Sequence, residues 1–154
     1  MIINPLRIKA LITDMQAQIS SINSSEIVID DSQLTKFLEE LKIVENYFLL
    51  AIIPEYPLTG DQDRLKWKNQ LMFMILKKTN DKNIKHNEFI SVLDETLAAA
   101  TQFVEILISE KSGDEGDFCG IANELVENSI KIYPIWNKSG CNGWGIDVDL
   151  LTNP

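Results

Sequence analysis

Apolar residues recur every three or four positions through the first 22 residues, which is the spacing of one face of a helix. Asn4 can cap this helix, and Pro5 suits its first turn because the ring holds φ near the helical value. The apolar stripe consists of Ile8, Leu11, Ile12, Met15, Ile19 and Ile22. Polar residues lie on the other side, so the sequence predicts an amphipathic helix that packs one face against a core.

Two further segments show helical spacing. One covers about residues 32–41, with Asp31 or Ser32 as its predicted cap. The other covers about residues 88–110, with Asn87 as its predicted N-cap, and its stripe is wider than a solvent-facing helix needs. That stripe contains Phe89, Val92, Leu93, Leu97, Ala99, Ala100, Phe103, Val104, Ile106 and Leu107. We therefore expect this long helix to lie across the face of a sheet.

Short runs of β-branched, aliphatic and aromatic residues predict the strands of that sheet. Residues 27–29 form a brief strand, and residues 46–57 and 67–79 each contain six consecutive apolar residues. Over so short a run, periodicity does not separate a strand from a helix, so both longer segments keep a helical alternative. We favour strands because isoleucines and aromatics suit a sheet and because Pro54 and Pro57 end the first segment.

Alternation with a period of two predicts a β-hairpin near the C-terminus, residues 130–150. Its second strand puts apolar residues on one face and Asp147 and Asp149 on the other. The turn is predicted within the stretch NKSGCNG, where Asn142-Gly143 is the pair best suited to positive φ. The hairpin thus supplies a core strand, and truncation within it is expected to unfold the domain.

The first strand of this hairpin is apolar on both faces. Pro134 and Trp136 share one face, while Tyr133 and Ile135 occupy the other. Pro134 has no N–H to donate, so it marks an edge strand or a bulge. We therefore expect a partner protein to bind at Tyr133, Ile135 and Trp136, where an edge strand offers an apolar outer surface.

Together these elements predict a single α+β domain over residues 1–154. An antiparallel sheet of about four or five strands carries the N-terminal helix and the long helix of about residues 88–110, and the C-terminal β-hairpin closes it. This order of elements resembles, in outline, the small proteins that complete or join bacteriophage-type tails. The resemblance is one of fold alone and covers no motif. It implies a structural subunit of a tail-like or mobile-element-encoded complex.

The acidic net charge of the chain disfavours nucleic acids and anionic membranes as classes of partner. The formal net charge is −9 and the isoelectric point is about 4.6. Nucleic-acid binding needs a dense basic surface, and the densest basic stretch is the pair Lys77-Lys78. No apolar run approaches the length of a membrane span, and the N-terminus lacks the pattern of a signal peptide. We therefore expect a cytoplasmic protein, or one assembled into a particle made there, that binds neither nucleic acid nor membrane.

Residues that could carry chemistry are few. His86 is the single histidine, and no nucleophile motif accompanies it. Cys119 and Cys141 are expected to be reduced, buried thiols, and they lack the spacing of a zinc site. The acidic loop 113–117 lacks the alternating ligands of an EF-hand and is interpreted as a solvated loop. We therefore predict no catalytic, metal or cofactor site.

The function favoured by these patterns is that of a non-catalytic structural or assembly subunit that acts through a protein partner or by self-assembly. The alternative is a small carboxylate-using enzyme or ligand-binding domain with a pocket near Trp136 and Trp144. Acids that converge beside either tryptophan would favour the alternative. An unpaired strand edge would favour the interaction subunit.

Overall fold

The structure, a computed structural model, describes residues 1–42, 47–79, 83–112 and 121–154. In these ranges a six-stranded sheet has the strand order β1-β2-β4-β6-β5, and β3 pairs with an end of β4. The strands are β1 (Ile22–Val28), β2 (Tyr47–Ile52), β3 (Leu58–Thr59), β4 (Lys66–Lys78), β5 (Lys131–Lys138) and β6 (Cys141–Thr152). The helices are α1 (Pro5–Gln18), α2 (Asp31–Glu40) and α3 (His86–Ser112), and two 3-10 turns, η1 (Ala122–Glu124) and η2 (Glu127–Ser129), precede β5. The α+β fold is confirmed.

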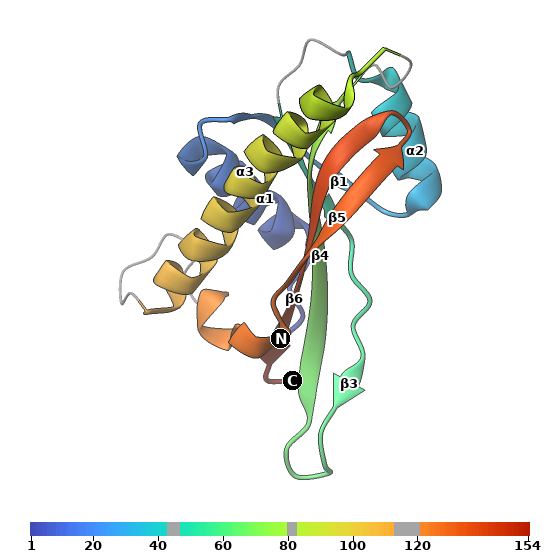
Figure 1. The fold of residues 1–154 in the computed structure, drawn as a ribbon. Helices are drawn as coiled ribbons and strands as arrows, with labels where there is room; N and C mark the ends of the chain where they lie inside the picture. Colours follow the sequence, from blue (N-terminus) through green and yellow to red (C-terminus); the bar gives the residue numbers. More distant parts are fainter. Residues whose placement is uncertain (43–46, 80–82, 113–120) are drawn as a thin grey trace.

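Helices α1 and α3 cover one face of the sheet, and α2 lies on the other (Figure 1). The α1–α3 side holds the larger core, where the rings of Phe73 and Phe103 meet with centroids 4.9 Å apart. The buried sheet residues on this side are Ile22, Leu49, Ala51, Leu71, Phe73, Ile75, Ile146, Val148 and Leu150. Their removal from water is the main term that holds the helices to the sheet.

Helix α2 covers only one end of the second face. Leu34 and Leu38 of this helix are fully buried. The buried residues they join are Val28, Phe48, Leu50, Met74, Leu76 and Cys141. Farther along β4 and β6, the uncovered part of the same face carries Gln70, Asp147 and Asp149. The second face is therefore buried under α2 at one end and exposed to solvent at the other.

The first helix begins as predicted. The Asn4 side chain accepts a hydrogen bond from the Arg7 N–H at 3.0 Å, and Pro5 is the first helical residue. The helix ends at Gln18, however, and Ile22, which fits the helical stripe by spacing, instead opens β1. β1 therefore begins earlier than the predicted strand at residues 27–29.

The predicted caps of the other two helices are wrong. Asp30, and neither Asp31 nor Ser32, caps α2, because its carboxylate accepts from the Gln33 N–H at 2.9 Å. Asn87 lies inside α3, which starts one residue earlier at His86.

The buried face of helix α3 is centred on slightly different residues from those predicted. Its buried residues are Val92, Thr96, Ala99, Ala100, Phe103 and Leu107. Thr96 fits this dry face because its hydroxyl donates to the Val92 carbonyl at 2.7 Å. The stripe is still wide, and the helix lies across the sheet as expected (Figure 1).

The strand prediction for the two ambiguous apolar segments, residues 46–57 and 67–79, is confirmed, since β2 lies within the first and β4 covers nearly all of the second. The sheet is mostly antiparallel, and the exception is the parallel pair β1–β2. α2 lies between these two strands in the chain, which is how parallel neighbours are usually connected. Beyond the helices, the β3 end of β4 projects from the body of the molecule (Figure 1).

The C-terminal hairpin of β5 and β6 is confirmed, but its turn is not at Asn142-Gly143. The turn is at Ser139-Gly140, where φ is +51° and +76°. Asn142 is a fully buried strand residue whose side chain donates to Thr79 Oγ1 at 2.8 Å and accepts from the Asn137 N–H at 2.7 Å. These buried hydrogen bonds outweigh the local turn preference of the Asn-Gly pair.

Candidate functional site

The three residues predicted to meet a partner lie on β5, which is an edge strand of the sheet. Trp136 is 75 % exposed, the largest exposure of any aromatic side chain among the described residues. Ile135 is half-buried because it packs against the cluster under α2. Tyr133 is also half-buried. The structure thus places all three on one strand, but only Trp136 is a freely presented side chain.

Tyr133 covers a glycine of the neighbouring strand. A Cβ added to Gly145 would lie 2.3 Å from the Tyr133 ring, so the ring rests where a side chain would otherwise stand. The Tyr133 hydroxyl donates to Asp147 Oδ1 at 3.1 Å. Burial, and then the Asp147 charge, raise the pKa of Tyr133 to about 12. The phenol is therefore a neutral packing group over the sheet.

The direction of the β5 backbone follows from its neighbour β6. The N–H of Asp149 donates to Ser129 Oγ, and its carbonyl accepts from the Val126 N–H, so both Asp149 groups point away from β4. Because backbone directions alternate along a strand, the N–H and carbonyl groups of Asp147, Gly145 and Gly143 also point away from β4, toward β5. Their register partners on β5 are Lys131, Tyr133 and Ile135.

The backbone groups of Ile132 and Pro134, which lie between these partners, must then point outward. Those of Trp136 do so too, because the Ile135 carbonyl before it and the Asn137 N–H after it are directed toward β6. We call the outward backbone groups of Ile132, Pro134 and Trp136 the β5 edge. No described residue forms a hydrogen bond with any of them. Pro134 fits here because its missing N–H removes no bond to β6. Asn137, at a φ of +48°, lies where the β5 register with β6 shifts, so this edge ends there.

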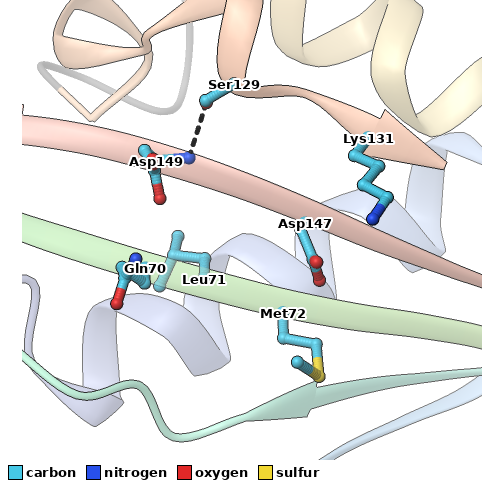
Figure 2. A pocket seen from close by; sticks show the side chains of 7 residues that line it. All are labelled: Gln70, Leu71, Met72, Ser129, Lys131, Asp147 and Asp149. Carbon is cyan, nitrogen blue, oxygen red and sulfur yellow. Dashed lines mark hydrogen bonds between the residues drawn. The ribbon is translucent and has the colours of Figure 1, made fainter.

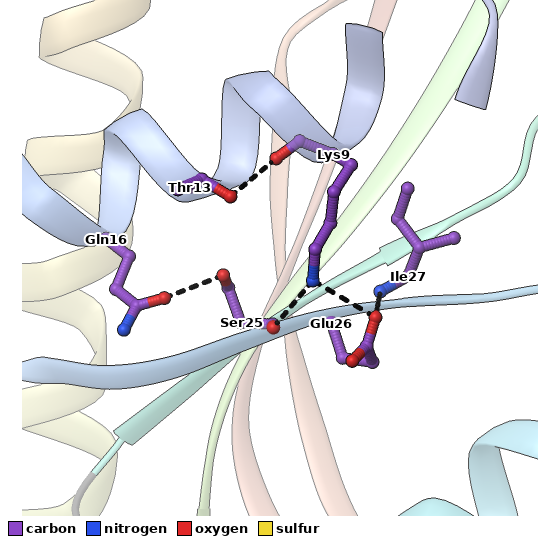
Figure 3. Close-up of polar contacts among 6 residues, drawn as sticks. All are labelled: Lys9, Thr13, Gln16, Ser25, Glu26 and Ile27. Carbon is purple, nitrogen blue, oxygen red and sulfur yellow. Dashed lines mark hydrogen bonds and ion pairs between the residues drawn. The ribbon is translucent and has the colours of Figure 1, made fainter. Parts of the chain in front are cut away.

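The β1 edge, on the opposite side of the sheet, is covered by side chains (Figure 3). Lys9 Nζ donates to the Ser25 carbonyl at 3.2 Å, and Gln16 Nε2 donates to the Asn23 carbonyl at 2.8 Å. The Ile27 N–H donates to the carboxylate of the preceding residue, Glu26, at 2.9 Å. Three backbone groups that could pair with another strand, two carbonyls and one N–H, are thereby occupied.

The uncovered part of the second face contains two adjoining hollows that share Gln70 and Met72. The polar one, about 360 Å³, also includes Lys131, Asp147 and Asp149 (Figure 2). The other, about 380 Å³, has mainly apolar walls made by Ile29, Ile52, Ile53 and Pro54, with Glu55 beside them. Both volumes are in the range of small-molecule sites.

The carboxylates of the polar hollow have partners on the sheet. Lys68 Nζ lies 2.9 Å from Asp149 Oδ2, and Asp147 accepts from Tyr133. Figure 2 shows the side chains of Asp147 and Met72 pointing to the same side of the sheet. Asp147 and Asp149, predicted to share a face, therefore each have a partner: the Tyr133 hydroxyl for Asp147 and the Lys68 ammonium for Asp149.

The remaining candidates are separate from this surface. Trp144 donates from its indole to the Leu93 carbonyl at 2.8 Å on the α3 side, and it lines neither hollow. Trp136 also lies outside both hollows. His86 is the exposed first residue of α3. The acidic loop 113–117 and Cys119 lie outside the described residues, and Cys141 is buried.

Sequence reasoning missed the residues of β4 and η2 that build the polar hollow, Gln70 and Ser129. A signal was present for the first, because Lys68, Gln70 and Met72 share one face by alternation. None was present for Ser129, since only the tertiary contact with Asp149 brings it there.

No protein-family model matches this chain, and the comparison with curated proteins finds no significant match. Among the described residues, no group of three metal-ligating side chains comes together. In the same ranges, no helix has the length and apolar character needed to cross a membrane.

Proposed function

We propose that this protein is a non-catalytic interaction or assembly subunit and that a protein partner binds it at β5. The observation that carries the proposal is the difference between the two edges of the sheet. Side chains cover much of the β1 edge, whereas no residue in the described ranges bonds to the β5 edge, which carries the exposed Trp136. An unpaired edge beside a large aromatic side chain is a common site for adding a strand from another protein.

A place in a bacteriophage-tail-like or mobile-element-encoded complex is a narrower form of the same proposal. It rests on the order of elements alone, with a long helix across the sheet and a hairpin that closes it. A location in the cytoplasm, or in a particle assembled there, belongs to this narrower form.

The alternative of a ligand-binding domain has one observation in its favour, the polar hollow around Asp147 and Asp149. The acids lie beside Lys68 and Tyr133, however, and not beside Trp136 or Trp144. A carboxylate already held by a lysine or a phenol is poorly placed as a general base, so we rank this alternative second.

Site-specific photo-crosslinking in the native host tests the main proposal. A photoreactive amino acid replaces Trp136 in one variant and Leu6 in a matched control. Leu6 is slightly more exposed, at 81 %, but lies on α1 away from β5. We expect one discrete adduct from position 136, whose mass identifies either a second copy or a different protein, and none from position 6.

The absence of an adduct at position 136, or the same adducts at both positions, would contradict the proposal. Binding of small ligands in the polar hollow with unchanged crosslinking at both positions would favour the ligand-binding alternative.

A further inference from the structure

Building on the proposed interaction role, we propose that β5 binds an extended strand of a different protein in which apolar and acidic residues alternate. The same geometry, through Pro134, disfavours pairing between two copies of this chain. Three observations support this inference: the hydrogen-bonding groups on the β5 edge, the distribution of charge along the hairpin, and the pattern of the strand already paired with β5.

The β5 edge offers few but well-spaced backbone groups. Ile132 and Trp136 each present an N–H and a carbonyl, and Pro134 presents only a carbonyl. An added strand would therefore be held at alternate residues along this stretch, with one bond missing opposite Pro134. Its side chains would alternate between the α3 side, beside Trp136, and the opposite face, beside Lys131.

Pro134 makes self-pairing less favourable than pairing with another strand. If two copies paired through β5, each would contribute a proline, so two ladder hydrogen bonds would be missing. A strand from a different protein would lose one. Each copy would also bring Lys131 to the contact, and like charges across a strand pair oppose it. Prolines and lysines on an edge are established means of preventing association of identical sheets.

One stretch of this acidic protein, from the start of β5 to the middle of β6, carries positive charge alone. The chain has a formal net charge of −9, yet residues 128–146 contain no acidic residue and include Lys131 and Lys138. Lys138 is paired with Asp31 at 3.0 Å. Lys131 forms no ion pair with any acid of the described residues, and its ammonium lies 5.8 Å from the Tyr133 ring centroid. An acid on an added strand would meet this lysine.

The strand already paired with β5 has the same pattern that we infer for the partner. β6 runs Ile146, Asp147, Val148, Asp149, Leu150, with apolar residues toward α1 and α3 and acids on the opposite face. Asp147 stands directly across from Lys131 in the register. A partner strand with this alternation would place its acids beside Lys131 and its apolar side chains beside Ile132 and Trp136.

Two blocked heptapeptides test the inference. In one, valine alternates with aspartate; in the matched control, valine alternates with lysine. Titration of the full chain is followed by ¹H–¹⁵N spectra, with the backbone amides of Ile132 and Trp136 and the Trp136 indole as reporters. We expect the acidic peptide to shift these signals and to bind about threefold more tightly at low salt, a preference that higher salt removes.

Substituting Lys131→Gln should abolish that preference, while the exposed control Lys36→Gln on α2 should keep it. Equal affinity for the two peptides, or shifts at residues away from β5, would overturn the inference. The absence of any shift at millimolar peptide would overturn it too.

Light scattering tests the part played by Pro134. We expect the wild type to remain monomeric as its concentration rises and Pro134→Thr, which restores an outward N–H, to form dimers. Pro57→Thr, at an exposed proline between β2 and β3, should stay monomeric. A wild-type dimer that Trp136→Ala dissociates would overturn the inference.

Failure of the inference leaves the proposed function standing if position 136 still gives a discrete crosslinked adduct. That adduct would then name a partner of different chemistry. If position 136 gives no adduct although the acidic peptide binds, the peptide site is real, and the interaction role in the host is what fails.

Discussion

The β1 and β5 edges belong to one sheet, and each could accept another strand. On β1, side chains of α1 reach over and bond outward carbonyls. Lys9 donates to the Ser25 carbonyl (Figure 3), and Gln16 donates to the Asn23 carbonyl. On β5, Pro134 has no N–H to offer at the edge, and Lys131 adds a positive charge beside it. Occupied backbone groups disfavour pairing with any strand, whereas proline and charge disfavour some strands more than others. The first edge is protected by bonds within the protein, and the second can be selective.

The two edges also differ in what supports them. β1 pairs with β2, and α1 packs on it and forms part of the larger core. In the part of the chain that the structure describes, β5 pairs with β6 alone, and its end toward the turn is irregular between Ile135 and Lys138. The order of the β5 edge therefore depends on β6, which lies between β4 and β5.

Truncation after Gly143 should have the largest effect, because it removes the strand that supports the β5 edge. It deletes most of β6, including the buried residues Ile146, Val148 and Leu150. We expect loss of the folded state, measured by circular dichroism and thermal unfolding. Truncation after Thr152, which removes only two exposed residues, is the control. A soluble chain ending at Gly143 with unchanged thermal stability would show that the tail is a docking arm.

Gly145→Ala should have the next largest effect, because the new Cβ collides with the Tyr133 ring at the centre of β5. Overpacking of this kind costs about 1–3 kcal/mol of unfolding free energy, measured in urea. In a Tyr133→Ala background the same substitution should cost much less, because the ring is gone. Additive effects in this double-mutant cycle would contradict the packing account.

Lys9→Ala should open the covered β1 edge. It removes the donor to the Ser25 carbonyl and the ion pair with Glu26. We expect a loss of about 0.5–1 kcal/mol of unfolding free energy and the appearance of association at high concentration. Lys36→Ala, at an exposed lysine on α2, is the matched control. If the two variants behave alike, the α1 side chains do not protect the edge.

The smallest effect should be the acid titration of Glu26 at the β1 edge. The Ile27 N–H hydrogen bond lowers the Glu26 pKa, burial opposes it, and Lys9 lowers the pKa further. The contribution of Glu26 to stability is therefore complete above its ordinary pKa of 4.5 and is lost as pH falls through the lower, folded value. We expect an NMR titration midpoint below 4.5 that rises in Lys9→Ala and not in Lys36→Ala. A midpoint unaffected by Lys9 would assign the whole shift to the backbone.

Much of the fold could be predicted from the pattern of apolar residues. The stripe from Ile8 to Met15, the two apolar runs and the alternation around Asp147 all correspond to elements of the predicted kind. Their ends were less predictable. Asp30 and Asp31 are both good caps by residue type, and only the geometry of the chain entering α2 selects the first.

The candidate site was predictable only in part. Trp136 is exposed on an edge strand. On the same strand, however, the Tyr133 ring packs over Gly145 and its hydroxyl donates to Asp147. Residue types do not show which face of β5 meets a neighbour, because both faces carry apolar residues. Asn142 illustrates the same limit, since a turn-forming pair was drawn into the sheet by hydrogen bonds with Thr79 and Asn137.

By itself, the sequence determined the kinds of element, the α+β class and the position of the closing hairpin, because these depend on local periodicity and on where prolines interrupt it. Tertiary structure alone decided that β1 and β2 run parallel, that β6 lies inside the sheet, and that α1 covers one edge while Lys131, Pro134 and Trp136 border the other. Strand order and the covering of edges depend on contacts between residues far apart in the chain, and a single sequence carries no local signal for them.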